Sequence, residues 1–365
     1  MLSPSTIMTW LERNVNGVRR SRLKTLSAIV PGAMAMVGVS THSLGRAMRS
    51  GTTAKHCIKR VNRFLGNTKL ECEAIAKGVF DVFAPKRGRV LVLADWTDVA
   101  NGKMLVFAMP CNGRSIPFYT KVVPKNAGKG ALKKAEMAGL AELKRICDSR
   151  SEVVIVADRG FGNKRWLSDV RAHGFHFVQR LSNVFHVETE RYIGALSDMD
   201  LRKKAKARNW GRGTIGEEEV IEGVLITTYD PKAKEPWYLV TDLDDLSGED
   251  VVRIYRQRWW IETTFRDKKN REWGLGLDNV ELKSHERYER LFYIVALAFI
   301  FLSAHGAAAE QNGFADTLKA NTRKTRVLNL LRTGSFYITR HGASVKEAIR
   351  ALQRLAECKA APNWG

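Results

Sequence analysis

The chain has 365 residues, with 60 Lys or Arg against 38 Asp or Glu, and a formal net charge of +22. This length suits two or three domains with a sizeable core, and the charge favours a polyanionic partner, most simply nucleic acid. Five scattered cysteines without a CxxC pair exclude a sulfur-ligated zinc site, and no GxxxxGK loop supports nucleotide-driven chemistry. A very basic ribosomal-type or membrane-surface protein is the alternative class.

Residues 1–88 are expected to form a helical DNA-binding domain. They carry 15 basic and 4 acidic residues, which is half of the net charge on about a quarter of the chain. We expect an amphipathic segment over 19–37, a second helix after Ser40, and a third over 54–65. The third helix is apolar on one side, as a helix that enters a DNA groove can be, although a solvated basic face is the alternative. Its opposite side carries Lys55, Lys59, Arg60 and Arg63.

Residues 89–181 predict the first part of an α/β catalytic core. Buried-strand patterns lie at 90–94, 104–108, 116–122, 153–157 and 175–181, with helices at 129–148 and 164–172. The order β-β-β-α-β-α-β, followed by a later helix, predicts a ribonuclease-H-like mixed sheet flanked by helices on both faces.

Residues 182–247 predict a β-rich insertion into that core, with strands near 184–187, 215–222, 224–229 and 238–242. Its basic run at 202–208 is expected to be a solvated loop, with a DNA contact as the alternative. Residues 248–306 should supply the last core helices. The apolar run 291–304 is too short to span a bilayer, and we expect a buried helix there. Residues 307–365 form a basic helical region that is a candidate for dimerisation.

Three carboxylates are the candidate catalytic residues. Asp95 follows Val-Leu-Val-Leu-Ala and Asp158 follows Val-Val-Ile-Val-Ala, so each ends a buried strand, where α/β folds usually place their sites. Glu262 lies in the later helix. Three such oxygen donors can hold two Mg²⁺ ions, with Mn²⁺ as a possible replacement, for phosphodiester chemistry. Asp98 competes with Asp95, but Asp95 ends the strand directly.

Glu262 belongs to a polar stripe on a helix that we expect to run unbroken from residue 255 to 269. Tyr255, Arg258, Glu262 and Lys269 lie at offsets 0, 3, 7 and 14, within an arc of roughly 60°. Arg258 and Lys269 are expected to grip DNA phosphates, and Tyr255 to donate a hydrogen bond to one. Surface ion pairing along the helix is the alternative.

Trp237 opens a strand of the insertion after Lys-Glu-Pro. From the residues alone a packed core tryptophan is the preferred interpretation, and stacking on an extruded base is the alternative.

The spacing Tyr-x2-Arg-x3-Glu-x6-Lys, together with Asp-Trp-Thr-Asp, Ala-Asp-Arg-Gly-Phe and Lys-Glu-Pro-Trp-Tyr-Leu-Val-Thr, resembles the bacterial insertion-sequence transposases of the IS-four family. The similarity covers about residues 55–280 and is closest to the IS-ten branch. It implies a DDE triad of Asp95, Asp158 and Glu262, and cut-and-paste DNA transposition through a hairpin intermediate. It also implies that Trp237 stacks a flipped base.

The expected partner is double-stranded DNA, both the inverted terminal repeats of the element and the target, bound by a homodimer. No signal peptide opens the chain and no membrane partner is expected, which predicts a bacterial cytoplasmic protein. Two other functions stay open: a ribonuclease-H-like nuclease that cuts structured DNA without joining it, and a non-enzymatic DNA-binding regulator.

Overall fold

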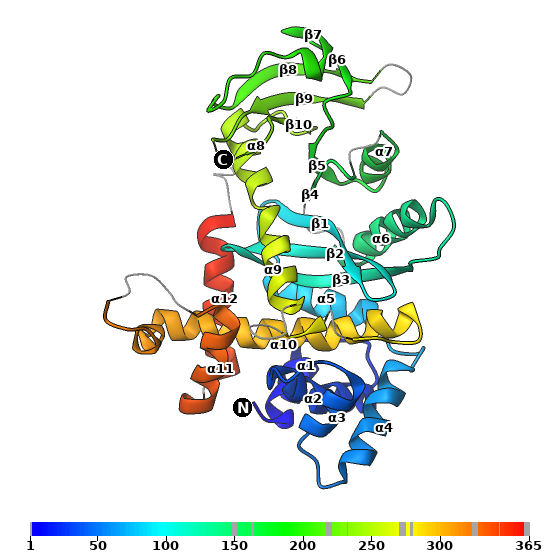
Figure 1. Cartoon of the computed structure of the whole chain (residues 1–365), viewed down its shortest axis with the longest axis vertical. Coiled ribbons are helices and arrows are strands. Elements are labelled where there is room, and N and C mark those ends of the chain that lie inside the picture. The colour runs from blue at the N-terminus through cyan, green and yellow to red at the C-terminus, as the bar shows by residue number, and fades with distance from the viewer. Residues whose placement is uncertain are drawn as a thin grey trace.

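The computed structural model describes residues 2–147, 152–161, 164–216, 221–231, 233–269, 275–277, 280–322, 328–342 and 344–360, without the side chains of residues 164, 269 and 358–360. Within these residues a ten-stranded sheet occupies the upper part of the molecule as seen in Figure 1, and helices pack around its lower half and below it. The strands are β1 (Val90–Val99), β2 (Gly102–Cys111), β3 (Arg114–Pro124), β4 (Val153–Ala157), β5 (His176–Arg180), β6 (His186–Thr189), β7 (Tyr192–Ala195), β8 (Arg208–Ile215), β9 (Ile221–Thr228) and β10 (Trp237–Thr241).

The helices follow the predicted order, with several boundaries within a few residues of those expected. They are α1 (Pro4–Asn14), α2 (Arg20–Met34), α3 (Thr41–Ala47), α4 (Ala54–Leu65), α5 (Cys72–Phe83), α6 (Ala131–Cys147), α7 (Lys164–Ala172), α8 (Gly248–Arg256), α9 (Trp259–Lys269), α10 (His285–Gln311), α11 (Leu330–His341) and α12 (Val345–Ala360).

The first five strands form the ribonuclease-H-like core in the spatial order β3-β2-β1-β4-β5. Strand β1 is parallel to β4, and β4 to β5, whereas β2 is antiparallel to both neighbours. Residues 90–94 are buried throughout, as in a central strand that is covered on both faces. The predicted mixed α/β sheet with flanking helices is confirmed.

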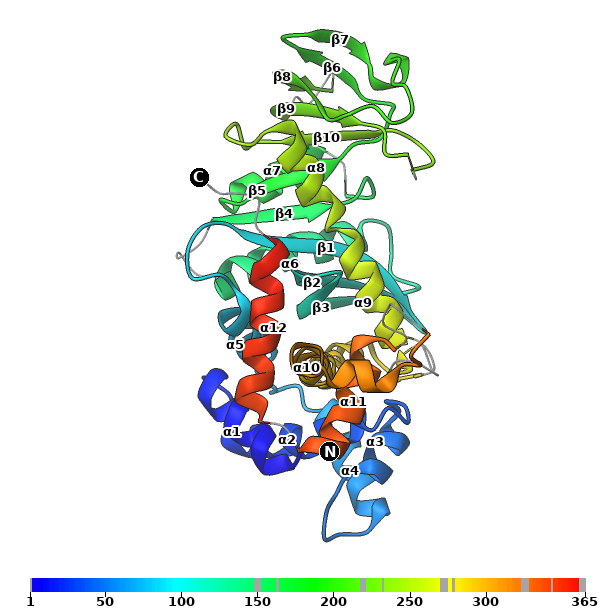
Figure 2. The ribbon, with the colours of Figure 1, turned by 90° about the vertical axis from the view of Figure 1, so that its left-hand side faces the viewer.

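The insertion lengthens this sheet and does not form a separate layer. Strand β10 pairs antiparallel with β5, and β9, β8, β6 and β7 follow outward to the far edge (Figures 1 and 2). The basic run 202–208 precedes and enters β8, and its residues 202–204 are exposed, as expected for a solvated loop.

One strand of the insertion was predicted in the wrong place. β8 ends at Ile215, where the sequence pattern places the start of a strand. β8 contains Gly211 and Gly213, and glycine has a low β-strand propensity, so the sequence does not indicate a strand there. The pairing with β9 is irregular between Asn209 and Arg212, and Gly211 has a φ of +87°. At Gly213 a side chain would collide with the backbone oxygen of Glu188, because an added Cβ would lie 2.1 Å from it.

Helix α10 is the hub on which both ends of the chain pack. It contacts β3 as well as α2, α4, α11 and α12, and lies between the sheet and the N-terminal helices (Figure 1). Trp10 of α1 meets Phe301 of α10 edge-on, with ring centroids 5.3 Å apart. Arg290 donates from Nε to the backbone oxygen of Leu65, at the end of α4.

α10 is long and apolar enough to cross a membrane by length and composition. However, 94% of its most apolar stretch is buried inside the protein. The prediction of a buried core helix in this region is therefore confirmed.

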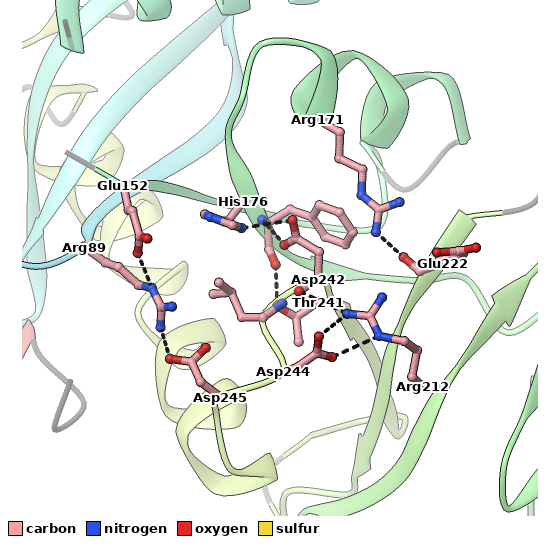
Figure 3. A network of polar contacts seen from close by, with 12 residues as sticks. Arg89, Glu152, Arg171, His176, Arg212, Glu222, Thr241, Asp242, Asp244 and Asp245 are labelled. Carbon is pink, nitrogen blue, oxygen red and sulfur yellow. Dashed lines mark hydrogen bonds and ion pairs between the residues drawn. The ribbon is translucent and has the colours of Figure 1, made fainter. Parts of the chain in front are cut away.

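Polar contacts tie the loop between β10 and α8 to the core (Figure 3). Arg89, just before β1, donates from Nε to Glu152 at 2.8 Å and from Nη1 to Asp245 at 2.6 Å. Asp242 accepts from the backbone N–H of Phe177 at 3.0 Å and lies 3.0 Å from Nδ1 of His176. These contacts fix where α8 begins, and so where the chain returns across the sheet.

Candidate active site

Asp95 and Asp158 lie side by side. Asp158 directly follows β4, as predicted, but the prediction that Asp95 ends its strand is wrong, because β1 continues to Val99 in its pairing with β2. In the parallel pairing of β1 with β4, Ala94 is opposite Ala157, so Asp95 and Asp158 come next at the same level of the sheet. Neighbouring strands are about 4.8 Å apart and residues in register share a face. Two carboxylates that are 63 positions apart in the sequence are thus adjacent in the fold.

The face on which Asp95 points is set by the alternation of β1. Trp96, the next residue, points to the opposite face, where its Nε1 donates to Glu136 of α6 at 3.0 Å. Asp95 therefore points toward α9, which lies across β1, β2 and β3 (Figure 1). Its Oδ1 accepts from the Trp96 backbone N–H at 2.8 Å.

The prediction of one unbroken helix from residue 255 to 269 is wrong. α8 ends at Arg256, and a turn at residues 257 and 258 precedes α9. The backbone N–H of Arg258 donates to the backbone oxygen of Tyr255 at 3.0 Å, and that of Ile261 donates to the backbone oxygen of Arg258 at 3.1 Å. Both bonds span three residues. The turn is tighter than an α-helix, so 100° per residue does not hold across it.

Arg258 stands at this break and bridges two of the three candidate carboxylates. Its Nη2 lies 2.7 Å from Oε1 of Glu262, one turn onward, and its Nη1 lies 3.6 Å from Oδ2 of Asp95. The Arg258 side chain is 6% exposed, whereas that of Glu262 is 41% exposed. A buried guanidinium therefore separates the sheet carboxylate from the helix carboxylate.

Burial raises the pKa of Asp95 to about 7. The Arg258 guanidinium opposes this shift, whereas the negative charges of Asp158 and Glu262 add to it. Asp158 and Glu262 therefore both lie within electrostatic reach of Asp95.

The donor set is of the kind that Mg²⁺ or Mn²⁺ prefers, because it consists of carboxylate oxygens. Its arrangement is not that of a formed metal site. Among the residues that the structure describes, no group of three or more His, Cys, Asp or Glu side chains is placed to hold a metal ion. The contacts of Arg258 with Asp95 and Glu262 give the physical reason.

Tyr255 and Trp237 are packed residues here. Tyr255 is 1% exposed and Trp237 is 6% exposed, and their rings meet edge-on with centroids 5.0 Å apart. Burial raises the pKa of Tyr255, and the nearby guanidinium groups of Arg258 and of Arg180, at the end of β5, partly oppose this. The preferred interpretation of Trp237 as a core residue agrees with this packing, whereas contact of either ring with DNA stays a prediction.

The basic face of α4 is largely open to solvent. Lys55, Lys59 and Arg63 are exposed, while Arg60 is partly buried and reaches the backbone oxygen of Lys24 at 3.5 Å. Cys57, Val61, Phe64 and Leu65 are buried on the other side. Lys269 is the last residue of α9, and its side chain lies outside the described residues.

Residues beside Asp158 were missed by the sequence argument. Arg159 and Arg180 both donate to Oε1 of Glu235, at 2.8 and 2.7 Å. Arg159 could have been identified from the Ala-Asp-Arg motif, and Arg180 from its position at the end of a predicted strand. Their convergence on Glu235 depends on the pairing of β5 with β10, which no spacing rule reveals.

α9, the helix that carries Glu262, is anchored on the sheet by two residues that follow Glu262. Thr264 accepts from the Ser115 backbone N–H at 2.8 Å, and Asp267 accepts from Nε of Arg114 at 2.6 Å. Both partners lie at the start of β3. The helix is thus held over β3, β2 and β1, the last of which carries Asp95.

Residues 120–301 match a family model described as a transposase DDE domain. The chain carries a transposase DDE domain. Asp158 and Glu262 lie inside the matched DDE domain, and Asp95 lies before its start, on β1. A comparison with curated proteins found no match.

Proposed function

We propose that the chain is a cut-and-paste DNA transposase whose DDE triad is Asp95, Asp158 and Glu262. The observation that supports the proposal is the alignment of Asp95 with Asp158 across β1 and β4, with Arg258 in contact with both Asp95 and Glu262. The match of residues 120–301 to a transposase DDE domain agrees with it. The net charge of +22 supports a polyanionic substrate.

The proposed reaction has four steps. Water attacks a phosphodiester at each element end and releases a 3′-hydroxyl. That hydroxyl attacks the opposite strand, which closes a hairpin and frees the flanking DNA. Water then opens the hairpin, and the regained 3′-hydroxyl attacks target DNA.

Asp95, Asp158 and Glu262 would hold Mg²⁺ or Mn²⁺. When bound, the cation would supply Lewis-acid stabilisation of phosphodiester oxygens. The protein's own part is to orient the strand end. β1 and β4 fix the two aspartates, and the anchors of α9 on β3 hold the helix that carries Glu262.

The remaining predicted contacts complete the proposal. Arg258, Lys269 and Tyr255 would hold terminal phosphates, and the exposed cations of α4 would contact the terminal repeat. Stacking of Trp237 on a base would require its packing against Tyr255 to open.

At the level of whole regions, residues 1–88 would bind DNA, 89–181 and 248–306 would form the catalytic core, and 182–247 its insertion. Residues 307–365 would contribute to a homodimer that bridges two element ends. We also propose the IS-four family and its IS-ten branch as the finer placement, on the Tyr-x2-Arg-x3-Glu-x6-Lys spacing.

A cleavage and joining assay on the element's own ends, with Mg²⁺, tests this function. Glu262→Gln keeps the size of the side chain and removes its charge, so we expect at least a 100-fold loss of cleavage with DNA binding retained. Full cleavage by this variant would refute the triad. Cleavage by the wild type without joined products would favour a nuclease. Binding without either reaction, unaffected by Asp158→Asn, would favour a regulator.

A further inference from the structure

Arg258 occupies the space that a shared cation of Asp95 and Glu262 would need. A divalent cation ligated by both carboxylates would hold each oxygen about 2.1 Å away, so the two oxygens would lie within about 4 Å of each other. Here one guanidinium reaches both, at 3.6 Å and 2.7 Å. The same two oxygen atoms cannot serve the guanidinium and the cation in this geometry.

The position of Arg258 is held on several sides but is not fully satisfied. The guanidinium lies over the Trp259 ring, 4.9 Å from its centroid, and 6.0 Å from the Tyr255 centroid. Among the described residues, its buried Nε has no hydrogen-bond partner. Because its Nε–H donor is unused, the buried Arg258 guanidinium would gain a hydrogen bond by moving to a phosphate, whose oxygens accept several N–H bonds.

The charge balance also favours an exchange. Arg258 places one positive charge between two carboxylates that repel each other, and the Asp95 side chain is only 13% exposed. Withdrawal of Arg258 alone would worsen the repulsion, whereas its exchange for a divalent cation would relieve it. Departure of Arg258 and arrival of the cation should therefore occur together.

We infer that Arg258 keeps the carboxylate site closed in the free protein and leaves it for a DNA phosphate, so that divalent cation binding is coupled to DNA binding. This inference rests on the proposed function and adds to it the order of assembly. Because coupling between two ligands is reciprocal, the cation should tighten DNA binding by the same factor. The coupling prevents a metal-loaded site from forming where no DNA is present.

Mn²⁺ binding tests the inference without reference to catalysis. Free Mn²⁺ is measured by electron paramagnetic resonance during titration of the full-length protein, with and without a duplex of the element end. We expect the wild type to bind Mn²⁺ at least tenfold more tightly with DNA. Arg258→Gln should bind it at least tenfold more tightly than the wild type without DNA, and gain less than threefold when DNA is added.

Two further variants separate displacement from a general change in charge. Arg159→Gln also removes a positive charge beside Asp158, but Arg159 bonds to Glu235 and is 55% exposed. It should shift Mn²⁺ affinity less than threefold and keep the DNA effect. Arg258→Lys retains the charge but cannot bridge both carboxylates, so it should bind Mn²⁺ several-fold more tightly than the wild type. This variant tests the inference if Arg258→Gln does not fold.

The outcomes that contradict the inference are distinct. DNA-dependent Mn²⁺ binding by the wild type, with no gain in Arg258→Gln or Arg258→Lys, overturns the inference alone. An equal gain in Arg159→Gln overturns it as well. No Mn²⁺ binding by the wild type, even with DNA, overturns both the inference and the proposed function.

Discussion

Trp237 packs edge-on against Tyr255, with ring centroids 5.0 Å apart, and so joins the first residue of β10 to the last turn of α8. Both residues belong to motifs that suggested contacts with DNA. In the folded chain they first join the β-rich insertion to the helix that leads to Arg258. A variant at either position therefore tests packing before it tests recognition.

Trp237→Ala should lower the free energy of unfolding by about 3–5 kcal/mol, because it leaves a cavity against Tyr255. Trp237→Phe keeps an aromatic partner and should cost much less. Urea unfolding followed by circular dichroism measures both. An unchanged midpoint in Trp237→Ala would show that the ring is not part of the core in solution.

Phe301→Ala should destabilise the whole chain by about 3–5 kcal/mol, because Phe301 is fully buried and meets Trp10. Calorimetry should show the N-terminal helices and the core unfolding in one shifted transition. The comparison is Phe336→Ala, at a side chain that is 42% exposed on α11, which should change little. A separate, unshifted N-terminal transition would argue that residues 1–88 fold by themselves.

Glu136→Gln should stabilise the protein at neutral pH. Burial raises the pKa of Glu136, and the hydrogen bond from Trp96 only partly opposes this. Because the folded-state pKa lies above the unfolded one, the ionised carboxylate costs stability. That cost is absent below the unfolded pKa, grows as the pH rises from the unfolded toward the folded pKa, and is complete above the folded pKa.

The stability gain of Glu136→Gln over the wild type should thus appear at pH 7 and vanish near pH 4. Denaturant midpoints at both pH values measure it. Glu188→Gln, at an exposed position of β6, controls for loss of one negative charge. A gain that is equal at the two pH values would refute the burial argument.

Arg89→Ala should lower the free energy of unfolding by about 1 kcal/mol, and the loss should shrink in 1 M salt. Arg89 is 15% exposed and bonds to both Glu152 and Asp245, but these partners are 57% and 58% exposed (Figure 3). Arg20→Ala removes a pair whose arginine is 83% exposed, so it should cost less. Equal losses in the two variants would mean that the Arg89 network adds nothing beyond a surface pair.

The sequence by itself determined most elements of the core. Continuous apolar runs specified β1 and β4, because a strand that is covered on both faces has no polar face to alternate with. The caps of α4 and its two-sided pattern placed that helix at its observed limits. The same local logic placed Asp158 at the end of β4, but it ended the first strand too early, because β1 continues past Asp95 to Val99. The signature spacing selected Glu262 as a candidate.

Only the tertiary structure decided how those residues meet. The parallel register of β1 with β4 aligns the two aspartates, and that register depends on side chains packed from both faces. The predicted helix is interrupted by a turn at residues 257 and 258. Arg258, at this turn, contacts Asp95 of the sheet as well as Glu262 of α9. Helical periodicity describes a single helix, whereas this contact depends on where α9 is anchored on β3, a long-range constraint that no local pattern encodes.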